Sequence, residues 1–93
     1  MKIERVITVF DNITELLTEE INIDYIDLEK LRSLFNPSDN DPLMYDVYEI
    51  KADLVPSISK LLKEEIKFDL QKNTYYVECN QLPPYDFGKE KAR

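Results

Sequence analysis

The alternation of hydrophobic and polar residues at the start of the chain predicts a strand over residues 3–10. β-branched side chains dominate this stretch, and apolar residues occupy both of its alternating faces. A strand that is apolar on both faces is buried on both sides, so we expect a central position in a sheet. Asp11 and Asn12 then favour a turn, and because a tight-turn glycine is missing we expect a longer hairpin loop.

Residues 14–23 alternate as the returning strand of this hairpin. Leu17, Ile21 and Ile23 face inward in this alternation, and the polar residues between them face outward. Glu19 interrupts the pattern because it falls on the inward face. An exposed strand end would tolerate this carboxylate.

Leucines and a phenylalanine at helical spacing predict a short helix over residues 28–35. Asp24 and Asp27 precede it, and either carboxylate is a suitable N-cap. Asn36 is suited to end the helix, and Pro37 prevents its continuation.

The second half of the chain predicts a strand, a helix and a closing strand. Residues 45–50 form the third strand, and residues 74–80 form the fourth. Between them we expect a helix over residues 54–65, with Asp53 as its N-cap. Pro56 then lies in the first turn, where its missing N–H removes no helical hydrogen bond.

The predicted order of elements is β-β-α-β-α-β, which is typical of an α+β domain. We expect a single four-stranded, mainly antiparallel sheet with two helices on one face. This arrangement leaves the other face, or an edge strand, available to a partner. The domain spans residues 1–82, and residues 83–93 are predicted to be a disordered polar tail.

The net charge of −7 is concentrated in the middle of the chain, because residues 11–53 hold twelve carboxylates and three cations. Such acidity disfavours binding to nucleic acid and favours a basic partner. It could also serve only to keep a small protein soluble. The chain contains no apolar run long enough to cross a bilayer, and its single cysteine fits a reducing compartment, so we expect a cytoplasmic protein without membrane contact.

The usual sources of catalytic chemistry are missing from the sequence. It has no histidine to act as a general base or metal ligand, and a single glycine cannot form a phosphate-binding loop. Cys79 therefore reads as a core thiol rather than a nucleophile. The Asp39-Asn40-Asp41 segment lacks the glycine and the closing carboxylate of a calcium loop, since Met44 and Ile50 occupy those positions. We predict no enzymatic activity, no cofactor and no metal.

Four segments resemble small bacterial immunity proteins of contact-dependent growth inhibition and related polymorphic toxin systems. They are V-I-T-V-F-D-N-I-T-E-L, L-E-K-L-R-S-L-F-N, D-P-L-M-Y-D-V-Y-E-I and Y-Y-V-E-C, and together they span about residues 3–80. The resemblance implies a small cytoplasmic protein that neutralises a cognate toxin domain, often a basic nuclease, by stoichiometric contact. Two alternatives stay open, a general acidic interaction module (including a nucleic-acid mimic) and an unrecognised enzyme.

The acidic middle of the chain supplies the candidate contact residues. We predict that they face a basic surface of the partner: Asp39, Asp41, Tyr45, Asp46 and Glu49. Tyrosine is favoured at interfaces, and Tyr76 is a further candidate, whereas Tyr48 and Tyr75 are expected in the core. An exposed strand edge that adds to a toxin sheet is the other candidate surface.

Overall fold

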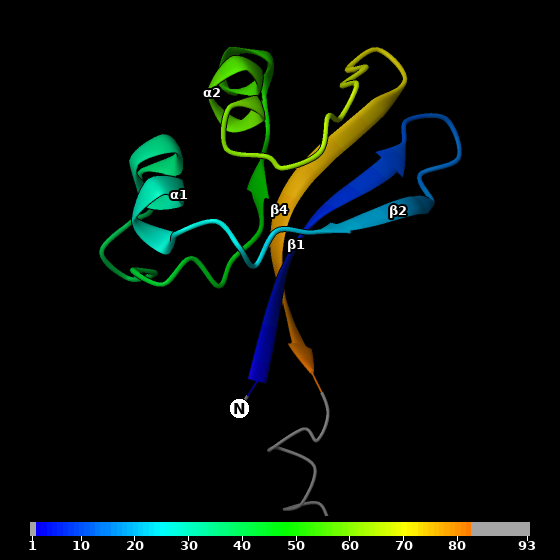
Figure 1. Ribbon diagram of the computed structural model, residues 1–93. Coiled ribbons are helices and arrows are strands. Elements are labelled where there is room, and N and C mark those ends of the chain that lie inside the picture. Colours follow the sequence, from blue (N-terminus) through cyan, green and yellow to red (C-terminus); the bar gives the residue numbers. More distant parts are fainter. Residues whose placement is uncertain (1, 83–93) are drawn as a thin grey trace, which may run out of the picture.

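Four strands form one antiparallel sheet in the order β2-β1-β4-β3 (Figure 1). The computed structural model describes residues 2–82, so the predicted disordered tail at 83–93 lies outside the described residues. The strands and helices are β1 (Lys2–Asp11), β2 (Leu17–Asn22), α1 (Leu28–Phe35), β3 (Tyr48–Glu49), α2 (Val55–Ser59) and β4 (Asn73–Leu82). The predicted α+β class and order of elements are confirmed.

The central position predicted for the first strand is confirmed, because β1 pairs with β2 on one side and with β4 on the other. The β1–β4 ladder is the longest in the sheet and runs from Lys2↔Leu82 to Asp11↔Asn73. It joins the two ends of the described chain, so the sheet forms only when these distant segments meet.

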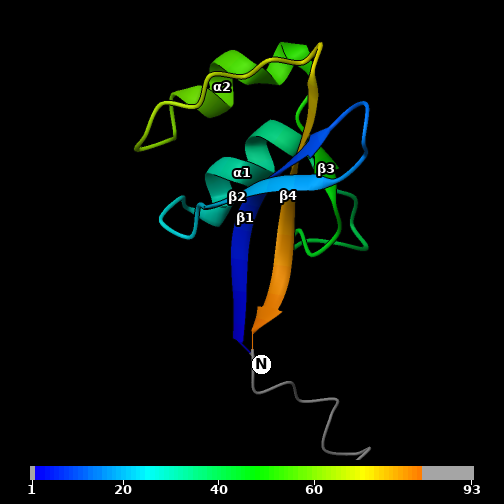
Figure 2. The same cartoon turned by 90° about the vertical axis from the view of Figure 1, so that its right-hand side faces the viewer.

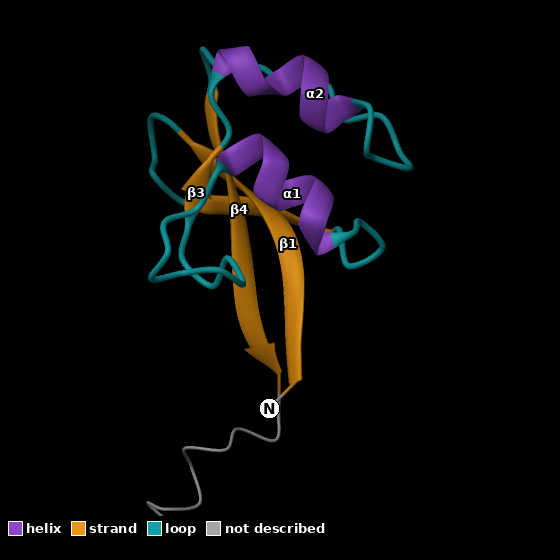
Figure 3. Cartoon of the chain, turned by 90° about the vertical axis from the view of Figure 1, so that its left-hand side faces the viewer, coloured by secondary structure: helices purple, strands orange, loops and turns teal. Residues whose placement is uncertain are grey.

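Both helices lie on the same face of the sheet (Figures 2 and 3). Ile7 and Val9 of β1 and Tyr75 and Val77 of β4 point to this face, since residues two apart on a strand share a face. They pack in one cluster with the buried side chains Ile23, Ile26, Leu31, Met44, Ile50 and Ile58. Within residues 2–82, no helix covers the opposite face, which we call the open face (Figure 2).

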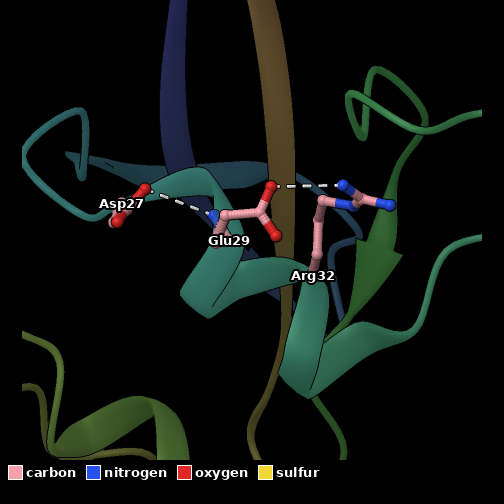
Figure 4. Close-up of polar contacts among 3 residues, drawn as sticks. All are labelled: Asp27, Glu29 and Arg32. Carbon is pink, nitrogen blue, oxygen red and sulfur yellow. Dashed lines mark hydrogen bonds and ion pairs between the residues drawn. The ribbon is translucent and has the colours of Figure 1, made fainter.

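Local signals set both ends of α1. The side chain of Asp27 accepts a hydrogen bond from the Glu29 backbone N–H at 3.3 Å, and Arg32 Nη1 lies 3.2 Å from Glu29 Oε2 (Figure 4). Asn36 adopts the left-handed conformation with φ 50° and ends the helix. The predicted bounds 28–35 are confirmed, and Asp27 rather than Asp24 is the N-cap.

The second helix is shorter than predicted. Helix α2 covers only Val55–Ser59 after a 3₁₀ turn at Ala52–Leu54, and no side chain caps it, so Asp53 is not its N-cap. The Leu61 and Leu62 N–H groups bond to carbonyls three residues back, which ends the α-helical ladder. Both leucines still pack against the core, so the predicted apolar stripe is buried without being helical.

A β-bulge corrects the predicted faces of β2. The pairing passes from Val9↔Glu19 directly to Phe10↔Leu17, so Thr18 has no paired residue opposite it on β1. Leu17 therefore shares the open face with Phe10 and is 47 % exposed, although the alternation predicted it to face inward. Glu19 stays on the helix-covered face at the edge of the sheet, where it is exposed.

The third strand is also shorter than the predicted 45–50. Only Tyr48 and Glu49 are paired residues of the ladder with β4, although the Ile50 N–H still donates to the Tyr75 carbonyl at 2.8 Å. At the start of the predicted strand, a neighbouring carboxylate binds the backbone N–H groups of Tyr45 and Asp46. Those two residues therefore belong to the loop that precedes β3. Within residues 2–82, no helix is long and apolar enough to cross a membrane.

Candidate protein-interaction surface

The loop from 36 to 47, here called the acidic loop, connects α1 to β3 and carries four of the five predicted contact residues. The fifth, Glu49, lies in β3, which is the edge strand next to β4. The structure separates these residues into one that is buried and four that are exposed.

Asp41 is the buried member, with 8 % of its surface exposed. Its Oδ1 accepts the Tyr45 N–H at 2.8 Å, and its Oδ2 accepts the Asp46 N–H at 3.0 Å and the Tyr48 hydroxyl. The Tyr48 hydroxyl is the main cause that lowers the pKa of Asp41, and the two backbone donors and the charge of Arg5 act in the same direction. Its carboxylate is thus occupied within the chain, and the prediction that Asp41 faces a partner is corrected.

Tyr48 fixes the end of the acidic loop to the core. Its ring packs against Phe35 with centroids 5.8 Å apart, which ties β3 to the end of α1. Burial, followed by the bond to Asp41 and the charges of Asp41 and Asp46, raises the pKa of Tyr48 to about 12. Its core position is confirmed in part, because the residue is half-buried and packs against the core cluster.

Arg5 is a structural residue whose role was not predicted from the sequence. Its Nη2 donates a hydrogen bond to the Leu43 carbonyl, and its backbone N–H donates to Asp24 Oδ1 at 2.8 Å. It lies in β1 at an alternating position with Ile3 and Ile7, on the face that carries the helices. A cation on the inward face of a strand needs a partner, and this signal was present in the sequence.

Met44 anchors the acidic loop from the other side. Its side chain is 1 % exposed and belongs to the core cluster, although its backbone is left-handed with φ 55°. A non-glycine residue in this conformation is held there by its surroundings. Here Met44 N–H donates to the Asp41 carbonyl at 3.1 Å, so the buried methionine and the buried carboxylate hold the same turn.

The loop thereby presents a mixed acidic and apolar surface. Large apolar side chains are exposed beside the carboxylates, with Leu43 at 45 %, Tyr45 at 47 % and Val47 at 56 %. We define the acidic-loop surface as the exposed residues Asp39, Leu43, Tyr45, Asp46, Val47 and Glu49. Aromatic and aliphatic anchors among polar groups are the usual composition of a protein interface.

A shallow hollow of about 260 Å³ adjoins this surface, lined by Ile3, Tyr45, Cys79 and Gln81. Cys79 is half-buried, and burial raises the pKa of its thiol. A raised pKa leaves the thiol protonated and unreactive, as expected for a packing residue. Within residues 2–82, no three side chains of the metal-binding types cluster.

The other tyrosines divide as follows. Tyr75 is 3 % exposed, so its predicted core position is confirmed. Tyr76 is half-buried on the open face, where its ring meets Phe10 edge-on with centroids 5.8 Å apart. It pairs with Glu49 of β3, so it lies beside that member of the acidic-loop surface.

The raised pKa of Tyr48 predicts a loss of stability in alkali. Folding favours the protonated phenol, so this stabilisation is complete below the ordinary pKa of 10.0 and is lost as the pH rises through about 12. Urea unfolding at about pH 8 and at about pH 11 gives the free energy of unfolding at each pH. We expect this free energy to fall less between the two pH values for Tyr48→Phe than for the wild type. Tyr45→Phe is the matched control, because it removes an exposed phenol. Equal pH dependence of the wild type and Tyr48→Phe would contradict the buried hydrogen bond.

A protein-family model matches most of the chain. The family model described as "Domain of unknown function (DUF7683)" matches residues 4–78. No curated protein matches the chain. The matched range begins just before Arg5 and ends within β4, so it includes the whole acidic loop.

Proposed function

The chain belongs to the DUF7683 family of domains of unknown function, and we propose that it is an immunity protein that neutralises a cognate bacterial toxin domain. It acts in the cytoplasm by stoichiometric contact and makes or breaks no covalent bond in the toxin. The toxin domain presents a basic surface, as a nuclease does where it holds the phosphates of its substrate.

The observation that carries this proposal is the acidic-loop surface. Three exposed carboxylates, Asp39, Asp46 and Glu49, lie beside exposed apolar side chains. Buried residues anchor the loop that carries most of this surface. Asp41 and Met44 order this loop before any partner arrives. Preorganisation lowers the entropy lost on binding, which is what a tight stoichiometric inhibitor requires.

The charge of the surface supplies the specificity of the proposed contact. Carboxylates on the loop can occupy the positions of substrate phosphates on a basic toxin, and complementary potentials accelerate encounter. Tyr45 supplies buried area at the centre of the contact, since tyrosine covers a large surface with few rotatable bonds. The inhibitor then blocks the toxin by covering its substrate path.

We expect a neighbouring gene to encode the toxin domain, and co-expression with that domain tests the function. We expect protection of the cell to reach its maximum at one molecule of this chain per toxin, and the two proteins to co-purify. The recovered toxin should have an unchanged mass and regain activity after denaturation separates the pair. Protection at amounts far below one per toxin would refute stoichiometric binding and favour an enzyme. Co-purification with an unrelated basic protein alone would favour the general interaction module.

Removal of the three exposed charges should slow association. We expect the triple variant Asp39→Asn, Asp46→Asn, Glu49→Gln to associate with the toxin about tenfold more slowly at low salt and to lose most of its salt dependence. The dissociation rate should change less, because charges at the rim of an interface act mainly on encounter. Stopped-flow association at two salt concentrations measures both effects.

A control variant carries the same change in net charge elsewhere on the surface. It replaces the exposed acids Asp53, Glu64 and Glu65 by their amides. We expect its association kinetics to stay closer to the wild type, because its charges lie outside the acidic-loop surface. If the two triple variants slow association equally, total charge rather than this surface steers the encounter.

A further inference from the structure

Within residues 2–82, strand β2 forms an unpaired edge of the sheet, at the side opposite to the acidic loop. In the order β2-β1-β4-β3 it pairs with β1 alone, whereas β3 and the acidic loop lie at the other edge. Figure 2 shows β2 in front of the sheet, with no helix over it. A free edge has main-chain hydrogen-bonding groups that can pair with another strand.

The register of the hairpin identifies these groups. Ile23 N–H donates to the Arg5 carbonyl at 2.9 Å, so Ile23 directs its main-chain groups toward β1. In an antiparallel ladder this direction alternates, so Ile21 also faces β1, while Glu20 and Asn22 direct their N–H and C=O groups outward. The outward groups of Glu20 and Asn22 have no hydrogen-bond partner within residues 2–82.

Carboxylates flank this edge on both faces of the sheet. Glu20 pairs with Thr8 and lies on the open face, whereas Glu19 pairs with Val9 and lies on the face that carries the helices. Both are exposed, and neither side chain makes a hydrogen bond or ion pair within the described chain. A strand added here would place neighbouring side chains, one on each face, beside these two carboxylates.

Exposed aliphatic side chains lie at the hairpin end of the same edge. Ile13 is 92 % exposed, Leu16 65 % and Leu17 47 %. An edge whose charges served only to repel other strands would gain nothing from these side chains, since exposed apolar groups promote association. Apolar contact is therefore available beside the acidic edge.

The charge of the edge decides which strand fits it. β2 contains two glutamates and no cation, so a second copy would set carboxylates against carboxylates along a short ladder. A strand with two adjacent cations places one beside Glu19 and the other beside Glu20. The occupant is thus a strand of a different protein.

We propose that the free edge of β2 is a docking site for an extended basic strand of a partner protein. The strand hydrogen-bonds to the main chain of Glu20 and Asn22, sets cationic side chains beside Glu19 and Glu20, and places an apolar residue against Leu16 and Leu17. The site is independent of the acidic-loop surface and goes beyond the proposed function, because it specifies a different edge and a different mode of binding.

The test uses amide hydrogen exchange with a synthetic peptide as the probe. The peptide has about eight residues, with two adjacent lysines among valine and threonine, which favour strands. In the free protein we expect the Glu20 and Asn22 amides to exchange rapidly and the Ile21 and Ile23 amides slowly. At a peptide concentration about ten times Kd, exchange at Glu20 and Asn22 should slow by about tenfold.

Two changes distinguish main-chain pairing of the peptide with β2 from attraction between opposite charges alone. A peptide that is N-methylated on the pairing edge should fail to protect these amides, because it keeps its charge and loses its donors. The variant Glu19→Gln, Glu20→Gln should bind the unmodified peptide about twofold to thirtyfold more weakly. The matched control Glu64→Gln, Glu65→Gln should bind as the wild type does.

Three results would overturn the proposal. They are unchanged exchange at Glu20 and Asn22, equal binding of the N-methylated peptide, and self-association of the Glu19→Gln, Glu20→Gln variant with no peptide binding by the wild type. The last result would show that the two carboxylates prevent the edge of β2 from pairing with a second copy of the chain. The triple variant of the acidic loop should bind the peptide normally, so failure of the loop surface and failure of the β2 site are distinguishable.

Discussion

Replacement of Asp41 by alanine is expected to lower the melting temperature by on the order of 10 °C. The change leaves the N–H groups of Tyr45 and Asp46 and the hydroxyl of Tyr48 without their acceptor, and the residue is buried. It also removes a negative charge that interacts with Arg5. Groups buried without a partner destabilise a fold more than the loss of an exposed contact does.

Asp39 provides the matched control, because it lies in the same loop and is exposed. Asp39→Ala should shift the melting temperature by no more than about 3 °C. Asp41→Asn should fall between the two variants, since one amide oxygen still accepts while the amide nitrogen meets a donor. Melting curves followed by circular dichroism measure all three. Similar curves for the alanine variants would show that Asp41 does not organise the loop.

Acid supplies an independent check of the same carboxylate. The pKa of Asp41 is lowered in the folded chain, so its contribution to stability is complete above the ordinary value of 3.8 and is lost as the pH falls through the lower folded value. The difference in stability between the wild type and Asp41→Asn should therefore shrink below about pH 4. A constant difference down to low pH would assign the effect to packing.

Replacement of Tyr45 by alanine is expected to weaken binding to the toxin by about thirtyfold or more and to leave the fold intact. Tyr45 is 47 % exposed and borders the hollow lined by Ile3, Cys79 and Gln81, so its ring can be covered by a partner. Only its backbone N–H takes part in the bond to Asp41, and alanine keeps that group. Calorimetric titration of the toxin domain gives the change in affinity, and a thermal melt confirms the fold.

The phenylalanine variant separates the ring from the hydroxyl. Tyr45→Phe retains the apolar ring and should keep most of the affinity if burial of the ring supplies it. The loss should appear mainly in the dissociation rate, in contrast to the charge variants of the same surface. Unchanged affinity of Tyr45→Ala with an intact fold would move the interface away from the acidic loop, and the edge of β2 would be the next surface to test.

The incorrect predictions for β2 and α2 share a physical origin. The face of Leu17 was wrong because a bulge at Thr18 breaks the alternation, and nothing in the local pattern marks that residue. The second helix was predicted too long because its apolar stripe is buried by contacts with the core. Burial satisfies a hydrophobic pattern in a turn as well as in a helix, so the pattern alone cannot give the length.

The candidate site likewise depends in part on contacts that the local pattern does not reveal. Asp39, Tyr45, Asp46 and Glu49 were predicted to be accessible, and they are exposed. Asp41 has the same charge and lies in the same loop, yet it is buried. Its role depends on Tyr48 and on Arg5, which comes from another strand. Composition identified the acidic segment but could not separate the carboxylate that builds the loop from those that the loop presents.

The features that could be predicted from the sequence are those that short-range interactions control. Asp27 and Asn36 mark the two ends of α1 through contacts within a few residues, and the two apolar faces of residues 3–10 required a central strand. The accessibility of each residue could not be predicted in this way, because it depends on partners far apart in the chain. Arg5 and Leu43 meet across 38 residues, and Thr8 and Glu78 across 70. These contacts form when the first and last strands pair, which closes the sheet, buries Asp41 and leaves the acidic-loop surface and the edge of β2 exposed.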